Sequence, residues 1–356
     1  MRAEYFNNIC SYFHCAEEEI RNFRPLPGGL VNESYLFELH GDEYVYRHPG
    51  KGSEQLIIRE NEKRSLLTAR QYGFDPTFLY MDGLSGWKIS RYVKDFREPD
   101  YKNAEDSAKV AGTLRRLHKV PYRAEYGIRP WEDALKLEGM LKVLQSRGLK
   151  VLQPEEPKAL QSEGLKVQQT EVPQALQPEE PKALRQEILK PQQEKKSETH
   201  RIPDEKNLRQ GQDIPYETLK TNVGKLCQKV IGDGIEPCFC HGDSYKPNWM
   251  LLPDGEVILI DWEYAGCADP GIDVGYYIAD AGYDFEEAKL FIREYLGADY
   301  SEKKEYHFLA YTAIIAYYWY VWALYREASG TISPEVIREP LSIWRDAAER
   351  FAEYLL

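Results

Sequence analysis

The sequence has little of what a nucleic-acid-binding protein needs. Acidic residues outnumber basic ones, with 58 Asp and Glu against 46 Lys and Arg, and the formal net charge is −12. Because contacts to a phosphate backbone require clustered positive charge, the composition argues against nucleic acid and favours a small-molecule partner. With 356 residues, the chain is long enough for two packed lobes or for one domain with additions.

Cysteine spacings typical of zinc or redox motifs are also missing. The six cysteines form no CxxC pair and no Cys/His zinc spacing, so we expect reduced thiols. The N-terminal residues MRAEYFNNIC mix charged with apolar side chains and lack the apolar core of a signal peptide. We therefore expect a cytoplasmic protein.

Long apolar runs are rare, with one exception. Residues 308–325 carry no charged side chain and reach the length of a membrane-span candidate. The run is rich in tyrosine and alanine, and globular patterns surround it. We interpret it as a buried helix and predict no membrane span.

Aromatic residues are absent from 143–212, where Gln, Glu, Pro and Lys dominate. LQPEEPKALQSEGLK at 152–166 recurs as LQPEEPKALRQEILK at 176–190. Such a composition buries too little apolar surface to offset the entropy of ordering, so we predict an inserted, mostly disordered linker.

The remaining sequence predicts a small α+β lobe followed by a mainly helical one. β-type runs at 35–39, 44–47 and 87–89 alternate with a helical segment at 53–72. Helical spacing recurs later, and the last sixty residues or so read as helix. The segments with this spacing are 103–120, 216–231 and 286–296.

The stretch CFCHGDSYKPNWMLLPDGEVILIDWEYA, residues 238–265, carries the polar residues best suited to catalysis. Two apolar runs flank Asp254-Gly255, a dipeptide that favours a two-residue hairpin turn. That turn would place Asn248 directly opposite Asp261, and opposed side chains on one face have Cβ atoms about 4.5–5.5 Å apart. An amide oxygen and a carboxylate at this separation suit Mg²⁺.

Asp243 lies in the loop that enters this hairpin, within His241-Gly242-Asp243. A carboxylate beside a metal-phosphate site can orient an attacking hydroxyl and accept its proton during phosphoryl transfer. Each of these residues alone would more often cap a loop. Their convergence, followed by the acidic Asp269 and Asp273, favours catalysis.

HGDxxxxN followed by IDWEYAG resembles the motifs of the aminoglycoside phosphotransferase and choline kinase superfamily. The resemblance implies an α+β, two-lobed protein-kinase-like fold with a small β-rich N-lobe and a larger, mainly α C-lobe. It implies ATP and Mg²⁺ as cofactors, Asp243 as catalytic base and His241 as the residue that shapes the catalytic loop. Asn248 and Asp261 would bind Mg²⁺.

The resemblance also divides the chain. Residues 1–93 would form the ATP-binding lobe and 94–142 the start of the C-terminal lobe. After the linker at 143–212, residues 213–356 would complete the catalytic and acceptor-binding lobe.

In the N-lobe, PGGLVNESYLFEL at 27–39 resembles the phosphate-covering loop of choline kinases, although Val31 stands where threonine is usual. This would place Gly28, Gly29 and Asn32 at the nucleotide.

Arg47, in YVYRHPGKG, matches the phosphate-binding basic residue of such kinases. Its expected ion-pair partner is Glu60 or, preferably, Glu62. A solvated surface pair is the alternative interpretation. Tyr92 and Val93 would follow as the hinge that touches adenine.

Trp319 and Trp322 lie three residues apart on one face of an aromatic helix. Such a stripe is more often core than ligand site, but aromatic cages bind quaternary ammonium groups. The Trp-x-x-Trp pattern resembles the choline-pocket helix of choline kinases. Further acceptor-site residues implied by the resemblance are Glu263, Asp280, and Tyr283 or Phe285.

These motifs resemble the bacterial choline kinase branch and favour choline as the acceptor. Ethanolamine, an aminoglycoside or a sugar-like metabolite remain open. A kinase-like binding protein without activity is the alternative from another class. The presence of Asp243, Asn248 and Asp261 argues against it.

Overall fold

The computed structural model describes residues 2–27, 31–123, 126–146 and 214–356, which all belong to one compact unit. Most of the predicted linker at 143–212 lies outside the described residues, as do Gly28 and Gly29. Residues 143–146 form the end of a helix, so the predicted start of the linker is too early.

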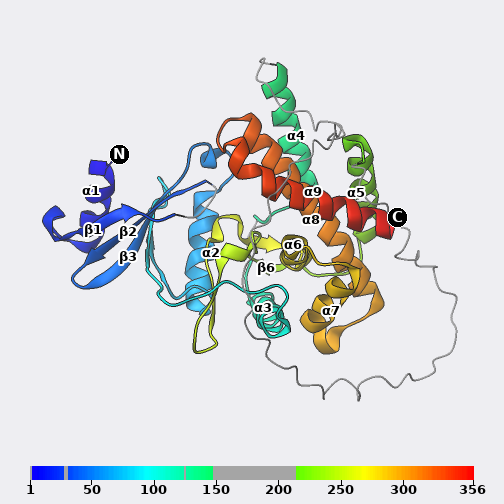
Figure 1. Ribbon diagram of the computed structural model, residues 1–356, viewed down its shortest axis with the longest axis horizontal. Helices are drawn as coiled ribbons and strands as arrows, with labels where there is room; N and C mark the ends of the chain where they lie inside the picture. Colours follow the sequence, from blue (N-terminus) through cyan, green and yellow to red (C-terminus); the bar gives the residue numbers. More distant parts are fainter. Residues whose placement is uncertain (1, 28–30, 124–125, 147–213) are drawn as a thin grey trace, which may run out of the picture. The chain divides into compact units, whose positions relative to one another are not determined.

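A five-stranded antiparallel sheet forms the N-terminal part, in the order β1-β2-β3-β5-β4 (Figure 1). The predicted strands at 35–39, 44–47 and 87–89 are confirmed within β2, β3 and β5, whereas β1 and β4 were not predicted. The strands are β1 (Arg21–Pro25), β2 (Glu33–Leu39), β3 (Asp42–His48), β4 (Phe78–Met81) and β5 (Lys88–Arg91).

Strand alternation gives this sheet two different faces. Phe37, Tyr44 and Tyr46 join a buried cluster with helix α1 (Arg2–Phe13). The neighbouring residues of β3 and β5 point to the opposite face. Helix α2 (Arg59–Gln71) contacts β4 of the same sheet. Arg47 and Lys88 are cross-strand partners, so both extend from this second face.

Helices make up most of the C-terminal part. The predicted helices at 103–120, 216–231 and 286–296 are confirmed as α3, α5 and α7. The helices are α3 (Ala104–Leu117), α4 (Pro130–Ser146), α5 (Tyr216–Val230), α6 (Gly271–Ala281), α7 (Phe285–Leu296), α8 (Glu302–Ala328) and α9 (Pro334–Leu355). Short 3₁₀ turns are η1 (Glu17–Glu19), η2 (Ser53–Gln55), η4 (Lys246–Asn248), η5 (Trp262–Tyr264) and η6 (Gly297–Asp299).

Local signals explain where these helices begin and end. Asp284 accepts a hydrogen bond from Glu287 N (2.8 Å), and the Glu287 side chain accepts one from Asp284 N (3.0 Å). This reciprocal capping box starts α7. Gly282 ends α6 in a left-handed conformation with φ of 63°.

Helix α8 is long and apolar enough to cross a membrane by length and composition, but 94% of its apolar window is buried inside the protein. It packs against α4, α5, α6 and α9. The prediction of a buried helix at 308–325 is therefore confirmed.

Two short two-stranded ladders connect the sheet part to the helices. The strand β6 (Cys238–Cys240) pairs with β9 (Gly266–Ala268), and β7 (Trp249–Leu251) pairs with β8 (Val257–Leu259). The loop between β6 and β7 contains Asp243. The two ladders thus flank the loop that contains Asp243.

Candidate active site

The hairpin formed by β7 and β8 differs from its prediction by one residue. Leu252 N donates to Glu256 O (2.9 Å) and Gly255 N to Leu252 O (3.0 Å), which closes a three-residue loop with Gly255 at φ of 90°. Trp249 therefore pairs with Leu259, and Asn248 lies opposite Ile260. The predicted direct opposition of Asn248 and Asp261 is wrong, because the turn has three residues instead of two.

Asp261 nevertheless reaches the same cavity as Asn248. Its backbone is left-handed, with φ of 71° and ψ of 63°, where the chain leaves β8 and enters η5. A strictly extended residue here would have continued the alternation of the strand. The left-handed turn redirects the side chain, so Asp261 lines the cavity that Asn248 also lines.

The loop between β6 and β7, which contains the predicted base Asp243 and which we call the catalytic loop for that prediction, is held by the buried carboxylate of Asp273 on α6. Its oxygens accept hydrogen bonds from the backbone N–H of His241 (2.8 Å) and of Gly242 (2.7 Å). The Ser244 hydroxyl donates to the backbone carbonyl of Asp273 (2.8 Å). Asp273 is fully buried, so it fixes the loop away from competing water.

The ring of His241 bonds to backbone atoms at both of its nitrogens. Its Nε2 lies 2.9 Å from Ile260 O, which can only accept, so Nε2 carries the hydrogen. Nδ1 then accepts from Asp243 N (3.2 Å). Burial lowers the pKa of His241, which agrees with a neutral ring.

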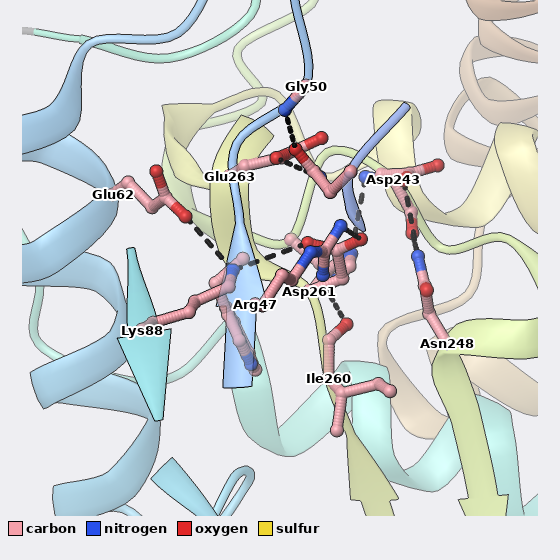
Figure 2. A network of polar contacts seen from close by, with 12 residues as sticks. Arg47, Gly50, Glu62, Lys88, Asp243, Asn248, Ile260, Asp261 and Glu263 are labelled. Carbon is pink, nitrogen blue, oxygen red and sulfur yellow. Dashed lines mark hydrogen bonds and ion pairs between the residues drawn. The ribbon is translucent and has the colours of Figure 1, made fainter. Parts of the chain in front are cut away.

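Asp243 is the carboxylate at the centre of the loop. Asn248 Nδ2 donates to both its backbone oxygen (2.9 Å) and its Oδ2 (3.2 Å; Figure 2). Burial, followed by the negative charges of Asp261 and Glu263, raises the pKa of Asp243 well above its usual range. The environment favours a carboxylate ready to accept a proton.

Asp261 is the most strongly charge-compensated acid of the site. Arg47 donates to its Oδ2 (2.6 Å), and Lys88 Nζ lies 3.6 Å from Oδ1 (Figure 2). Although burial alone would raise it, the charges of Arg47 and Lys88 lower the pKa of Asp261 to about 2. Asp261 is therefore ionised under all ordinary conditions.

The donor set at this point fits a hard cation. Asp261 Oδ1 is buried and accepts no hydrogen bond within the described residues. Asn248 uses its Nδ2 for Asp243, which leaves its amide oxygen for another partner. A carboxylate oxygen and an amide oxygen are ligands that Mg²⁺ accepts.

The basic residues of the sheet are arranged differently from the prediction. Glu62 pairs with Lys88 Nζ (3.0 Å) and with Arg59 (2.9 Å), whereas Arg47 pairs with Asp261. The predicted Arg47–Glu62 ion pair is wrong. Lys88 was missed because it becomes a neighbour of Arg47 only through the pairing of β3 with β5.

Glu263 and Asn32 tie the site to the segment before β2. Asn32 Nδ2 donates to Glu263 Oε2 (2.9 Å), and Asn32 Oδ1 accepts from Gly50 N (3.1 Å). Burial, together with the charge of Asp261, raises the pKa of Glu263. Both residues line the same cavity as Asp243, which places these two predicted residues at the site.

A single cavity of about 380 Å³ connects these groups. At one end it is lined by residues of the sheet and of the segment after β5, including the predicted Arg47, Tyr92 and Val93. The backbone N–H of Tyr92 already donates to Glu43 O (3.0 Å). An adenine contact from Tyr92 would therefore use its carbonyl oxygen.

The other end of the cavity is lined by aromatic rings. The predicted Trp319 and Trp322 lie 5.2 Å apart between ring centroids, and Trp344 of α9 lies 5.6 Å from Trp319. Tyr276 stacks on Trp319 at 5.2 Å. Tyr264 accepts a hydrogen bond from Trp322 Nε1 (3.0 Å). We call this set, Tyr264, Tyr276, Trp319, Trp322 and Trp344, the aromatic box.

Two predicted acceptor-site residues lie elsewhere. Asp280 accepts hydrogen bonds from the Tyr101 hydroxyl and from Lys246 N, and it does not line the cavity. Tyr283 donates to Tyr101 O (2.7 Å) and also contacts Ser107. Neither side chain lines the cavity, and both contact Tyr101 in the segment before α3, so the assignment of Asp280 and Tyr283 to the acceptor pocket stays a prediction.

Comparison with known proteins identifies the family. The sequence model of the family described as choline/ethanolamine kinase matches residues 23–354. The chain belongs to the choline/ethanolamine kinase family. The match spans both the sheet part and the helical part described above.

A curated relative matches only part of this choline/ethanolamine kinase family member. Protein LicA of Haemophilus influenzae is 29% identical over 97 residues, which are 26% of this chain and 36% of that protein. The match thus spans about a third of the length of this curated relative.

Solved structures show the fold. The choline kinase LicA from Streptococcus pneumoniae covers 99% of this chain and of its own at 20% identity, with a TM-score of 0.67. A structure of LicA in complex with AMP covers 98% of this chain and 96% of its own at 20% identity, with a TM-score of 0.64. The predicted two-lobed kinase-like α+β fold is therefore confirmed.

Proposed function

We propose that this choline/ethanolamine kinase family member transfers the γ-phosphoryl group of ATP to the hydroxyl of choline. The observation that carries the proposal is the single cavity that joins Asp243 and Asp261 to the aromatic box. One end offers charge-handling groups suited to a nucleotide phosphate, and the other offers aromatic faces suited to a quaternary ammonium group. A similar structure described as a choline kinase supports the acceptor, and one described as a complex with AMP supports the nucleotide.

Asp243 is proposed as the base of the reaction. Asn248 holds its Oδ2, and the hydrogen bonds from His241 and Gly242 to Asp273 hold its backbone. A raised pKa makes the carboxylate a better proton acceptor for an attacking hydroxyl, provided that the carboxylate is ionised. Positioning and electrostatics supply most of the acceleration in phosphoryl transfer.

Mg²⁺ is the proposed cofactor, with Asn248 and Asp261 as its protein ligands. When bound, the ion neutralises negative charge on the phosphates of the nucleotide. Arg47 and Lys88 add two further positive charges on the sheet side of the same cavity. Glu62 and Arg59 keep Lys88 in place.

The aromatic box selects the acceptor in this proposal. A trimethylammonium group donates no hydrogen bond, so ring quadrupoles and nearby carboxylates have to attract it. Glu98 and Glu263 line the same cavity and supply negative charge. The same carboxylates could accept hydrogen bonds from the primary ammonium group of ethanolamine, which makes ethanolamine the second candidate.

The compartment and the nucleotide-binding lobe remain parts of the proposal. We place the reaction in the cytoplasm, where ATP is available and where free thiols are stable. All six cysteines are free in the structure, which is compatible with that placement. Residues 1–93 would carry the nucleotide, and 94–142 with 213–356 the acceptor.

The deciding experiment measures ADP formation with Mg²⁺ on choline, ethanolamine and a panel of aminoglycosides. We expect turnover that favours choline and is lost in Asp243→Ala, which controls for contaminating kinases. Turnover on ethanolamine alone would make ethanolamine the acceptor instead of choline. ATP binding without turnover on any acceptor would overturn the enzymatic proposal in favour of a kinase-like binding protein.

A further inference from the structure

Two thiols and an imidazole come together behind the catalytic loop, outside the cavity described above. The ligand atoms of His118, Cys238 and Cys240 all lie within 4.8 Å of one another. Cys240 is fully buried, and only 5% of the His118 side chain is exposed. The sequence alone does not reveal this cluster, because His118 at the end of α3 is far from β6 along the chain.

Cys238 and Cys240 are two residues apart along β6, so their side chains point to the same side of the strand. Their sulfur atoms lie 3.6 Å apart. Two thiolates on one tetrahedral Zn²⁺ lie about 3.8 Å apart, given Zn–S bonds of about 2.3 Å. The pair is therefore already spaced for a shared metal ion.

His118 has the hydrogen-bonding pattern of a metal-ligating histidine. Its Nε2 lies 2.9 Å from Asp273 Oδ2, and a carboxylate can only accept, so Nε2 carries the hydrogen. In the neutral ring, Nδ1 then presents its lone pair and accepts from the Tyr295 hydroxyl (2.7 Å). Metal-binding histidines commonly donate their other N–H to a carboxylate in this way.

Tyr295 packs beside His118, with ring centroids 5.5 Å apart and ring planes at 74°. Burial, followed by the charges of Cys238 and Cys240, raises the pKa of the Tyr295 hydroxyl. A metal ion on Nδ1 would have to displace this hydroxyl or take its oxygen as a further ligand.

We propose that His118, Cys238 and Cys240 form a binding site for Zn²⁺, separate from the magnesium site at Asn248 and Asp261. Thiolate and imidazole ligands favour Zn²⁺, whereas the oxygen ligands of the cavity favour Mg²⁺. A water molecule or the Tyr295 hydroxyl would supply the fourth ligand of a tetrahedral site.

Binding requires that both thiols lose their protons. The Cys240 thiol now donates weakly to Ala268 O (3.4 Å) and to Asp269 O (3.5 Å). Because Zn²⁺ binds the thiolate form, protons compete with the metal ion for the sulfurs and occupancy decreases as the pH falls. Each Zn²⁺ bound therefore releases protons to solvent.

The site acts on the catalytic loop through Asp273. The carboxylate that holds His118 is the one that accepts the backbone N–H groups of His241 and Gly242. Zinc on Nδ1 would strengthen the Nε2–H donor and anchor Asp273 more firmly. Occupancy should therefore stabilise the loop against unfolding.

The test titrates reduced, chelator-treated full-length protein with Co²⁺, followed by competition with Zn²⁺. We expect a thiolate-to-cobalt charge-transfer band at one equivalent, displaced by Zn²⁺ and lost in both Cys238→Ser and Cys238→Ala. Cys267→Ser is the matched control, since Cys267 pairs across the ladder with Phe239 and lies outside the cluster. It should keep the band.

Asp261→Asn separates this site from the magnesium site, because cobalt held by oxygen ligands gives no thiolate band. The band should persist in that variant even though the variant disrupts the proposed magnesium site. Absence of a thiolate band in the unmodified protein, or its persistence in both Cys238 variants, would overturn the proposal. So would a shift in melting temperature with Zn²⁺ that is equal in Cys238→Ser and in the unmodified protein.

Discussion

Lys88 and Glu62 form a buried ion pair, with Nζ and Oε1 3.0 Å apart, between the sheet and α2. The same ammonium group lies 3.6 Å from Asp261 Oδ1. It therefore interacts with both Glu62 of α2 and the proposed magnesium ligand. Its position opposite Arg47 makes the phosphate end of the cavity doubly basic.

Lys88→Met is expected to destabilise the protein by about 3–5 kcal/mol, because it leaves Glu62 as a buried charge with only Arg59 beside it. Equilibrium urea unfolding measures the change. Lys94→Met is the control, since Lys94 pairs with Glu43 in solvent and should leave the unfolding midpoint nearly unchanged. If adding Glu62→Gln to Lys88→Met restores none of the lost free energy of unfolding, the unpaired charge of Glu62 does not account for that loss.

The pH dependence of turnover should follow Asp243. A base has to be ionised, so kcat/KM should fall as the pH falls through the raised pKa of this carboxyl. Glu263→Gln removes one of the negative charges that raise it. The acid limb of the profile should therefore move to lower pH, and a limb that stays in place or moves up would contradict this origin of the shift.

Gly242 allows a close approach within the catalytic loop. Its φ is 82°, and a Cβ there would lie 2.5 Å from Tyr264 O. Gly242→Ala should therefore reduce kcat by at least about tenfold by displacing the loop, besides adding backbone strain of about 1–2 kcal/mol.

Gly255→Ala is the matched control for that substitution. Gly255 also has positive φ, at 90°, but no atom of the described residues lies within 4 Å of its Cβ position. It should lose stability and keep its turnover. Equal losses of kcat in both variants, measured by ADP formation, would exclude the close approach as the cause.

Trp344 should contribute to acceptor binding as much as the predicted Trp319 and Trp322. Trp344→Leu is expected to raise the KM for choline by about 2- to 30-fold, the range of one cation–π contact, with the KM for ATP unchanged. Trp131→Leu is the control, because Trp131 packs on Tyr317 outside the cavity. A parallel rise in the KM for ATP would instead indicate a general disturbance of the fold.

Local patterns in the sequence were sufficient for much of the fold. The alternation at 35–39 and 44–47 predicted β2 and β3, and the helical spacing at 103–120 predicted α3. Asp243 and Asn248 were recognisable because they share one short segment, and the structure joins them by a hydrogen bond.

Contacts between residues far apart in the sequence could not be predicted from such local patterns. Lys88 enters the site through strand pairing, and Trp344 through the packing of α9 on α8. The hairpin register depended on whether Pro253 joins the turn, and no local preference decides this. The partners of Asp280 are of the same long-range kind, since its carboxylate accepts hydrogen bonds from Tyr101 and from Lys246 N.

The aromatic box also gives the protein an optical property of its own. The three indole rings of Trp319, Trp322 and Trp344 lie between 5.2 and 6.3 Å from one another, at fixed and mutually tilted angles. Rings this close couple their electronic transitions, so the near-ultraviolet circular dichroism should carry a signal from this end of the cavity. An acceptor that enters the box would change that signal without any label, and binding could be followed separately from phosphoryl transfer.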